Sequence, residues 1–200
     1  MEIVVVGVAE EDVVRAVKEA VEALASPIDV VVVGAEETKL ETEDVLLLKV
    51  SLPLDVYRVM REAALAKALS DPQLGEVWAV PPEVEPDELA YELSLALLRR
   101  LLDALVAERR PDLVVERARP EVVEGDTVAY TLVRTLAVDG SFSLAVAGRT
   151  SDALRLLESL SQHPIYGLYR QFWEFAAANF RFLPIYNWLI LAASPQGPPR

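Results

Sequence analysis

Apolar runs alternate with amphipathic segments over the first part of the chain. The apolar runs are rich in valine, whereas the amphipathic segments repeat their apolar side chains every three to four residues. The runs cover residues 3–6, 28–33 and 45–50, and the amphipathic segments cover residues 11–25 and 55–69. A strand that is apolar at nearly every position is typical of a parallel sheet covered on both faces. The pattern predicts an α/β fold, in which residues 1–120 form a Rossmann-like unit: a mostly parallel sheet with helices on both faces.

A long helix is predicted between two further strands. Residues 87–109 begin with two acidic residues and end at two arginines, an order of charges that suits the helix dipole. Shorter apolar segments before and after this helix, residues 76–80 and 112–119, are predicted as strands of the same sheet.

An alternating pattern around Asp139-Gly140 predicts an antiparallel β-hairpin over about residues 127–148. A two-residue turn would mix apolar and polar side chains on each face of the hairpin. A three-residue loop with a left-handed Gly140 instead pairs Leu136 with Phe142 and keeps one face apolar. The hairpin is therefore expected to be added to the sheet through this bulged turn.

The C-terminal part predicts helices rich in aromatic residues. Thr150 or Ser151 suits the cap of one helix, Pro164 suits the first turn of a second, and a later proline interrupts that helix before residues 185–193. We expect the hairpin and these helices, residues 121–193, to pack on the core of the first unit as one compact domain. Residues 194–200 contain three prolines and predict a flexible tail.

Charge and composition narrow the functional classes. The chain has 32 acidic and 19 basic residues, a net charge of −13, which argues against a general binder of nucleic acid or of anionic membranes. Of this charge, −14 falls in residues 1–150 and +1 in the last fifty. With no cysteine and one histidine, the chain cannot form a disulfide, a thiolate metal site or a multi-histidine metal site.

The sequence also predicts a cellular location and a thermophilic source. No segment has the basic start and apolar stretch of a signal peptide, and the apolar run over residues 182–193 is shorter than a membrane span, so a cytoplasmic location is expected. Asparagine, glutamine and methionine are scarce and charged residues make up 26% of the chain, a composition that indicates a thermophile.

Acidic residues follow the first two predicted strands. The turn after the first strand has only Gly7 and then three consecutive acids beginning at Glu10, which does not suit phosphate binding. Glu10, Asp12, Glu36 and Glu37 are instead candidate ligands of a small molecule or a divalent cation, because ligands bind at the carboxyl ends of parallel strands. The alternative is that these acids favour the helix dipole or are simply solvated. No cofactor is predicted apart from this possible divalent metal.

Arg134 and His163 are two further candidates. Arg134 falls on the apolar face of the predicted hairpin, so it either pairs with a carboxylate, extends to the sheet edge or contacts an anionic ligand. His163 lies between two predicted helices, where a histidine commonly bonds to the terminal carbonyls of a helix rather than acting in catalysis.

Nine of the 14 aromatic residues lie between residues 166 and 188. Their helical spacing gives one broad apolar face, and aromatic side chains are enriched in interface hot spots. The candidate interface residues are Tyr169, Phe172, Trp173, Phe180 and Trp188. The alternative is that the same cluster forms the core between the helices and the sheet.

Two functional hypotheses follow. The first is a non-catalytic interaction or scaffold subunit of a cytoplasmic complex, with a protein partner or a second copy of the chain, because no catalytic motif is present. The second is an α/β enzyme that binds a small ligand or a divalent metal at the acidic strand ends, a hypothesis that rests on analogy of fold alone.

Overall fold

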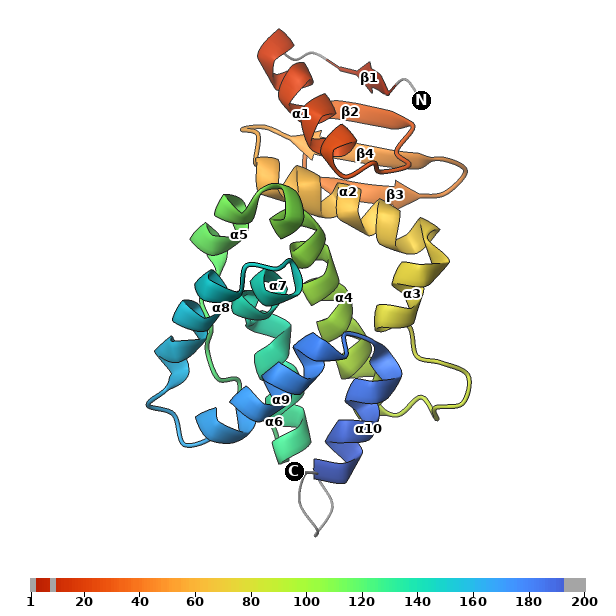
Figure 1. Cartoon of the computed structure of the whole chain (residues 1–200). Helices are drawn as coiled ribbons and strands as arrows, with labels where there is room; N and C mark the ends of the chain where they lie inside the picture. The colour runs from red at the N-terminus through yellow and green to blue at the C-terminus, as the bar shows by residue number, and fades with distance from the viewer. Residues whose placement is uncertain (1–2, 8–9, 193–200) are drawn as a thin grey trace. The chain divides into compact units, whose positions relative to one another are not determined.

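The chain folds into two compact units, Met1–Pro72 and Gln73–Arg200, which we call unit 1 and unit 2. The structure is a computed structural model and describes residues 3–7 and 10–192. Unit 1 contains the sheet and two helices, whereas unit 2 is helical (Figure 1). The boundary expected near residue 120 lies inside unit 2, and residues 194–200, predicted as a tail, lie outside the described residues.

The sheet of unit 1 confirms the mostly parallel arrangement. Its strands are β1 (Val4–Val6), β2 (Val30–Ala35), β3 (Lys39–Thr42) and β4 (Leu46–Ser51), in the spatial order β1-β2-β4-β3. The three valine- and leucine-rich strands are parallel, and β3 pairs with β4 in antiparallel orientation. The sequence pattern did not predict β3, because its four residues include one apolar side chain only.

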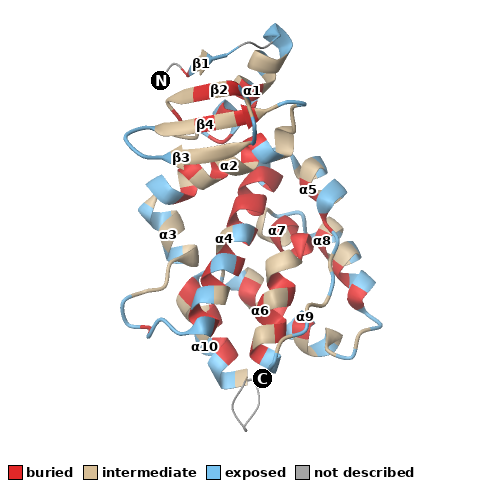
Figure 2. Cartoon of the chain, turned by 180° about the vertical axis from the view of Figure 1, so that it is seen from behind, coloured by how far each residue is buried: buried red, intermediate tan, exposed pale blue. Residues whose placement is uncertain are grey.

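Helices α1 (Glu11–Ala23) and α2 (Val56–Ser70) pack on one face of this sheet (Figures 1 and 2). The side chains buried on that face are Val31, Val33, Leu48 and Val50. The opposite face is not covered by helices of unit 1, so the expectation of helices on both faces is wrong for this unit. Successive valines make both faces of a strand apolar, but they do not show that this chain covers both.

Unit 2 is built from helices of varied length. They are α3 (Pro72–Trp78), which starts at the unit boundary, α4 (Glu88–Arg109), α5 (Pro111–Arg117), α6 (Val128–Val138), α7 (Gly140–Val146), α8 (Thr150–Leu157), the 3₁₀ turn η1 (Glu158–Leu160), α9 (Tyr166–Ala178) and α10 (Phe182–Ala192). Each helix of the described residues is too short or too polar to span a bilayer.

Helix α4 is the centre of unit 2 and confirms the long helix expected from the sequence. The Asp87 side chain caps it by accepting a hydrogen bond from Ala90 N at 2.7 Å. Every residue from Arg100 to Ala107 is buried, because α5, α6, α7 and α10 all pack against this helix. The charges at the two ends of the segment predicted this helix, and the structure adds the cap at Asp87.

The predicted β-hairpin over residues 127–148 is wrong, because this segment forms α6 and α7. Thr127 caps α6 by accepting from Tyr130 N, and Asp139 caps α7 by accepting from Ser141 N at 2.9 Å. Helix α6 contacts α4, α9 and α10, so apolar side chains are needed on several of its sides. That requirement produces a dense apolar pattern that resembles the alternation of a strand.

Two predicted strands and one predicted helix break also differ from the structure. The predicted strands over residues 76–80 and 112–119 are replaced by α3, with the loop after it, and by α5. Pro111 occupies the first turn of α5, where its missing N–H is not needed. Pro184 likewise lies in the first turn of α10 and does not interrupt a longer helix, since α9 already ends at Ala178.

Candidate functional site

The uncovered face of the sheet in unit 1 is a continuous apolar surface. Strand register places Val4 beside Val30 and Val6 beside Val32, and Val30 in turn lies beside Leu47. Val4 and Val6 are 55% and 51% exposed, and the other three side chains are half-buried. We call these five residues the open sheet face. A parallel sheet normally buries both faces, so an apolar face left open is a surface that another molecule can cover.

Paired charges on β3, on β4 and in the loop before β3 border the open sheet face. Lys49 Nζ lies 2.7 Å from Glu41 Oε1, and Lys39 Nζ lies 2.8 Å from Glu37 Oε1. The hydrogen bond from Lys39 lowers the pKa of Glu37, and that from Lys49 lowers the pKa of Glu41. Two acids and two lysines cancel, so this border is neutral although unit 1 has 15 acidic and seven basic residues.

The candidate ligands follow β1 and β2, which are parallel neighbours in the sheet. Gly7 has φ +118°, and a Cβ there would lie 2.3 Å from the Val33 carbonyl oxygen, so only glycine allows these two strand ends to approach. The four candidate side chains are exposed, and Glu37 is engaged by Lys39. They are Glu10, Asp12, Glu36 and Glu37. Within residues 3–7 and 10–192, no group of three or more His, Asp or Glu side chains is arranged to hold a metal ion.

Two hollows of several hundred Å³ are lined neither by the open sheet face nor by the four candidate ligands. One of about 510 Å³ is lined by six residues of α1 alone, so it is a shallow surface of a single helix. The other, of about 470 Å³, lies in unit 2 between the loop after α3 and the start of α10, where Pro81, Pro82 and Phe182 line it. Glu76 and Arg181 also line it and face each other at 3.6 Å. Its volume is in the range of small-molecule sites.

Arg134 lies on α6 and is paired with Glu92 of α4. Its Nε lies 2.9 Å from Glu92 Oε2 and its Nη2 lies 2.7 Å from Oε1, and the guanidinium lies over the Tyr130 ring at 5.3 Å. The hydrogen bonds to Glu92 raise the pKa of Arg134. An anionic ligand at Arg134 would have to compete with this bidentate carboxylate.

The Glu92–Arg134 pair gives a first prediction. Replacing Glu92 by glutamine is expected to lower the free energy of unfolding of unit 2 only slightly, because the pair is bidentate but a quarter to a third exposed. Urea unfolding of the single variants Glu92→Gln and Arg134→Gln and of the double variant measures the coupling. A coupling of zero would show that the two side chains do not pair in solution.

His163 lies at the junction of η1 and α9. Its Nδ1 accepts a hydrogen bond from Ile165 N at 3.3 Å, and its backbone N–H donates to Leu160 O. The contact is with a backbone amide rather than with the terminal carbonyls that the sequence suggested. This hydrogen bond to the backbone stabilises the turn between η1 and α9.

The aromatic cluster of α9 and α10 lies inside unit 2. Tyr169, Phe172, Trp173 and Trp188 are at most 5% exposed, and Phe180 is half-buried with its ring against Phe142. A side chain buried in its own unit is not available to a partner. For the four buried residues, the core interpretation therefore replaces the interface interpretation.

A buried polar network, missed at the sequence level, lies beside these rings. Asp139 is fully buried, and it accepts hydrogen bonds from Ser141 N, Ser141 Oγ and Tyr169 OH, the last at 2.8 Å. Burial raises the pKa of Asp139, and its hydrogen bonds oppose that shift. Burial and the nearby Asp139 charge hold the pKa of Tyr169 well above its usual value, so Tyr169 is the donor. The Asp-Gly sequence fits a turn between strands and equally fits a helix cap, so local pattern does not reveal this network.

A second buried pair adjoins this network. Arg100 and Asp103 of α4 are 3.0 Å apart and almost fully buried, and Ser143 Oγ donates to the Arg100 carbonyl at 2.9 Å. Neither of the two hollows described above is lined by these residues. The network joins α4, α7 and α9 and has the character of a structural core element.

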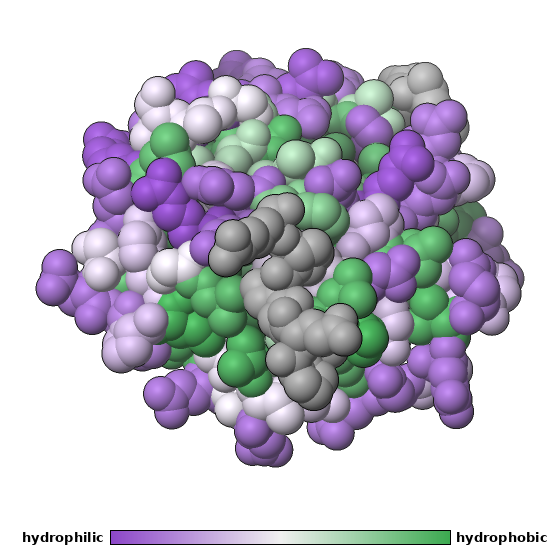
Figure 3. Space-filling view, turned by 60° about the horizontal axis from the view of Figure 1, so that its bottom comes forward, coloured by the Kyte–Doolittle hydropathy of each residue, from purple (hydrophilic) through white to green (hydrophobic). Residues whose placement is uncertain are grey.

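Single exposed apolar side chains also occur on unit 2. Val128, Ile190 and Leu191 lie near the ends of α6 and α10, and apolar surface is visible among hydrophilic side chains in the space-filling view (Figure 3). Exposed apolar residues of this kind are common on soluble proteins.

Comparison of the chain with protein-family models, with curated proteins and with solved structures finds no match.

Proposed function

We propose that the protein is a non-catalytic interaction or scaffold subunit, in which the open sheet face of unit 1 binds a protein partner. The observation that carries this proposal is the exposure of Val4 and Val6 on an otherwise well-packed sheet. Covering apolar surface is the main driving force of protein association, and the neutral border formed by Lys39 and Lys49 with their acids removes the charge repulsion present elsewhere on unit 1. The same proposal places this subunit in a cytoplasmic complex of a thermophilic organism.

The double substitution Val4→Glu with Val6→Glu tests this function. Both side chains are more than half exposed, so the variant is expected to fold, while two carboxylates on the open sheet face are expected to weaken partner binding by about tenfold or more. The measurement is capture of partners from cells of the native source, followed by mass spectrometry and by photo-crosslinking from position 6. The expected result is one partner that crosslinks from position 6 and is lost in the double variant.

Leu69→Glu is the matched control for this experiment. Leu69 is 48% exposed on α2, away from the open sheet face, so its substitution is expected to leave partner capture unchanged. Equal loss of the partner in both variants would contradict the proposal, and so would a partner that survives the Val4 and Val6 substitutions.

A small-ligand-binding function is the second candidate, and the hollow beside α10 is the observation that favours it. Its walls are mostly apolar with a few charged groups, including Glu76 and Arg181, as in many small-molecule sites. The metal-binding form of this hypothesis, at Glu10, Asp12 and Glu36, is examined by calorimetric titration with Mg²⁺, Mn²⁺ and Ca²⁺.

A further inference from the structure

One stripe of α4 faces solvent although the rest of the helix is largely buried. Tyr91, Leu95 and Arg99 are spaced four residues apart and therefore lie on the same side of the helix. Tyr91 is 63% exposed and Leu95 is 37% exposed, which makes Tyr91 the most exposed of the large hydrophobic side chains among the described residues. We call these three residues the α4 stripe. Tyrosine and arginine are residue types that carry binding energy at interfaces.

The charges along the α4 stripe have opposite signs at its two ends. Glu88 is exposed at the N-terminal end, one turn before Tyr91 and next to the capping Asp87. At the other end, Arg99 is exposed and makes no ion pair with any side chain of the described residues. Between them, Glu92 is already neutralised by Arg134. The stripe is therefore acidic at its start, apolar in its middle and basic at its end.

This order of charges is complementary to itself when one copy is reversed. Arg99 and Tyr91 each lie four residues from Leu95, about 6 Å along the helix axis, and Glu88 lies about 10 Å away on the Tyr91 side. When two stripes are antiparallel with Leu95 at their centre, Arg99 of each copy faces Tyr91 and Glu88 of the other. The guanidinium can then lie on the tyrosine ring and pair with the carboxylate.

We propose that the α4 stripe binds the α4 stripe of a second copy of this chain in an antiparallel, two-fold symmetric contact. A two-fold interface uses the same patch on both copies, and each contact on it occurs twice. Since each chain carries a net charge of −13, two copies repel each other on average, and a contact that sets Arg99 against Glu88 twice offsets this locally. A single pair of helix faces is a small interface, so the dimer is weak and reversible.

Charge reversal on the two ends of the stripe tests the proposed contact. In sedimentation velocity at low salt and at chain concentrations up to about 200 µM, the unmodified chain is expected to show a reversible dimer. Arg99→Glu places two acids opposite each other twice, and Glu88→Arg does the same with two bases. Each variant alone is expected to dimerise about tenfold or more weakly than the unmodified chain.

An equimolar mixture of the Arg99→Glu and Glu88→Arg chains is the decisive sample. In a mixed dimer, the new glutamate at position 99 of one copy faces the new arginine at position 88 of the other. On the second side of the same dimer, the unmodified Arg99 faces the unmodified Glu88, so both contacts are attractive again. We expect the mixture to recover dimerisation to within about threefold of the unmodified chain. A parallel contact, or a contact elsewhere on the surface, does not give this recovery.

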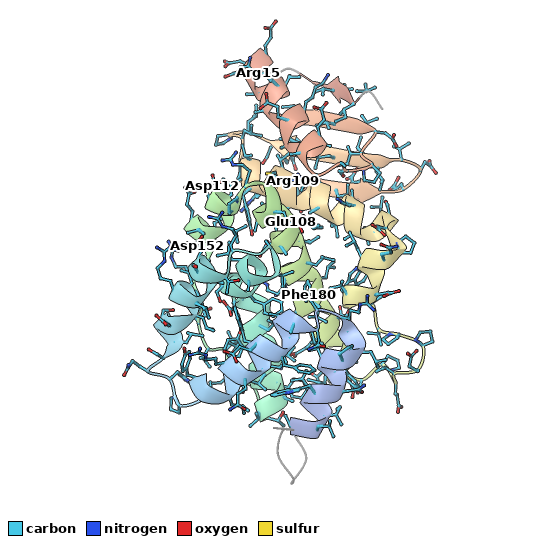
Figure 4. All side chains as sticks on the ribbon, viewed as in Figure 1. Arg15, Glu108, Arg109, Asp112, Asp152 and Phe180 are labelled. Atoms are coloured by element: carbon cyan, nitrogen blue, oxygen red, sulfur yellow. The ribbon has the colours of Figure 1, made fainter. Side chains whose placement is uncertain are left out.

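The matched controls are Arg109→Glu and Glu108→Arg. Both residues are exposed on the last turn of α4, labelled in Figure 4, and their substitutions change the net charge by the same amounts. They are expected to leave dimerisation within about twofold of the unmodified chain, and circular dichroism checks that all variants fold.

A monomer at about 200 µM would overturn the proposal, as would a mixture that does not recover or controls that weaken the dimer as strongly as the stripe variants. The result is independent of the open sheet face. The Val4→Glu, Val6→Glu chain is expected to dimerise normally, and the Arg99→Glu chain is expected to keep the partner captured through unit 1.

Discussion

Replacing Phe172 by alanine is expected to lower the free energy of unfolding of unit 2 by about 3–5 kcal/mol. Phe172 is fully buried in α9, and its ring lies 5.2 Å from that of Trp188 and 6.3 Å from that of Tyr169. The substitution removes apolar burial and leaves a cavity among rings that cannot all move to fill it. The loss is therefore expected to be at the upper end of single-residue effects.

Tryptophan fluorescence measures this loss directly. The three tryptophans, Trp78, Trp173 and Trp188, all lie in unit 2, so fluorescence during urea unfolding reports on this unit. Gln171→Ala is the matched control, since Gln171 is the exposed neighbour of Phe172 and its substitution is expected to change stability by less than about 0.5 kcal/mol. If Phe172→Ala is as stable as the control, the aromatic cluster is not the core of unit 2.

The sequence predicted the parallel part of the sheet and the longest helix for physical reasons that the structure confirms. Valine runs form β1 and β2, because β-branched side chains suit a pleated and buried strand, and a leucine-rich run forms β4. The capping Asp87 and the arginines after residue 108 marked both ends of α4. These elements are long or regular enough for local pattern to decide their type.

The short buried helices of unit 2 could not be predicted from local pattern. Helix α7 has seven residues, and the first five, Gly140 to Leu144, are buried. Gly140 is required there because a Cβ would lie 2.9 Å from Ala118 Cβ, a contact between segments distant in sequence. Tertiary packing of this kind decides whether an apolar segment of seven residues is helix or strand.

The sequence shows which residues are candidates for a site, but not which partners they have in the fold. The sequence predicts that acidic residues follow two neighbouring strands, and β1 and β2 are parallel neighbours, but ligand binding there stays a prediction. A carboxylate partner is one of the alternatives that the sequence leaves open for Arg134. Which carboxylate pairs with Arg134 depends on how α4 and α6 pack, and 42 positions separate Glu92 from it. The open sheet face was missed because a valine run shows that a face is apolar but not whether a helix covers it.

Replacing Asp139 by alanine is expected to lower the free energy of unfolding of unit 2 by about 2–4 kcal/mol. The substitution removes the cap of α7 and leaves the Tyr169 hydroxyl and the Ser141 N–H buried without their acceptor. Asp87→Ala is the matched control, because Asp87 also caps a helix but is exposed, and its loss is expected to cost about 1 kcal/mol. Equal losses in the two variants would contradict a special role for burial.

The isosteric variant Asp139→Asn separates the charge of this residue from its hydrogen bonds. Burial raises the pKa of Asp139 above its ordinary 3.8, so the folded state binds the proton more tightly than the unfolded chain does. Between pH 3.8 and the raised pKa, the folded state holds more protons, and stability falls as the pH rises; above the raised pKa this contribution is constant. Asparagine does not titrate. The unfolding free energy of the unmodified chain minus that of Asp139→Asn is therefore expected to decrease from about pH 3.5 towards pH 7, by about 1.4 kcal/mol for each unit by which the pKa is raised. A difference that increases with pH would mean that the hydrogen bonds from Ser141 and Tyr169 outweigh desolvation and lower the pKa instead.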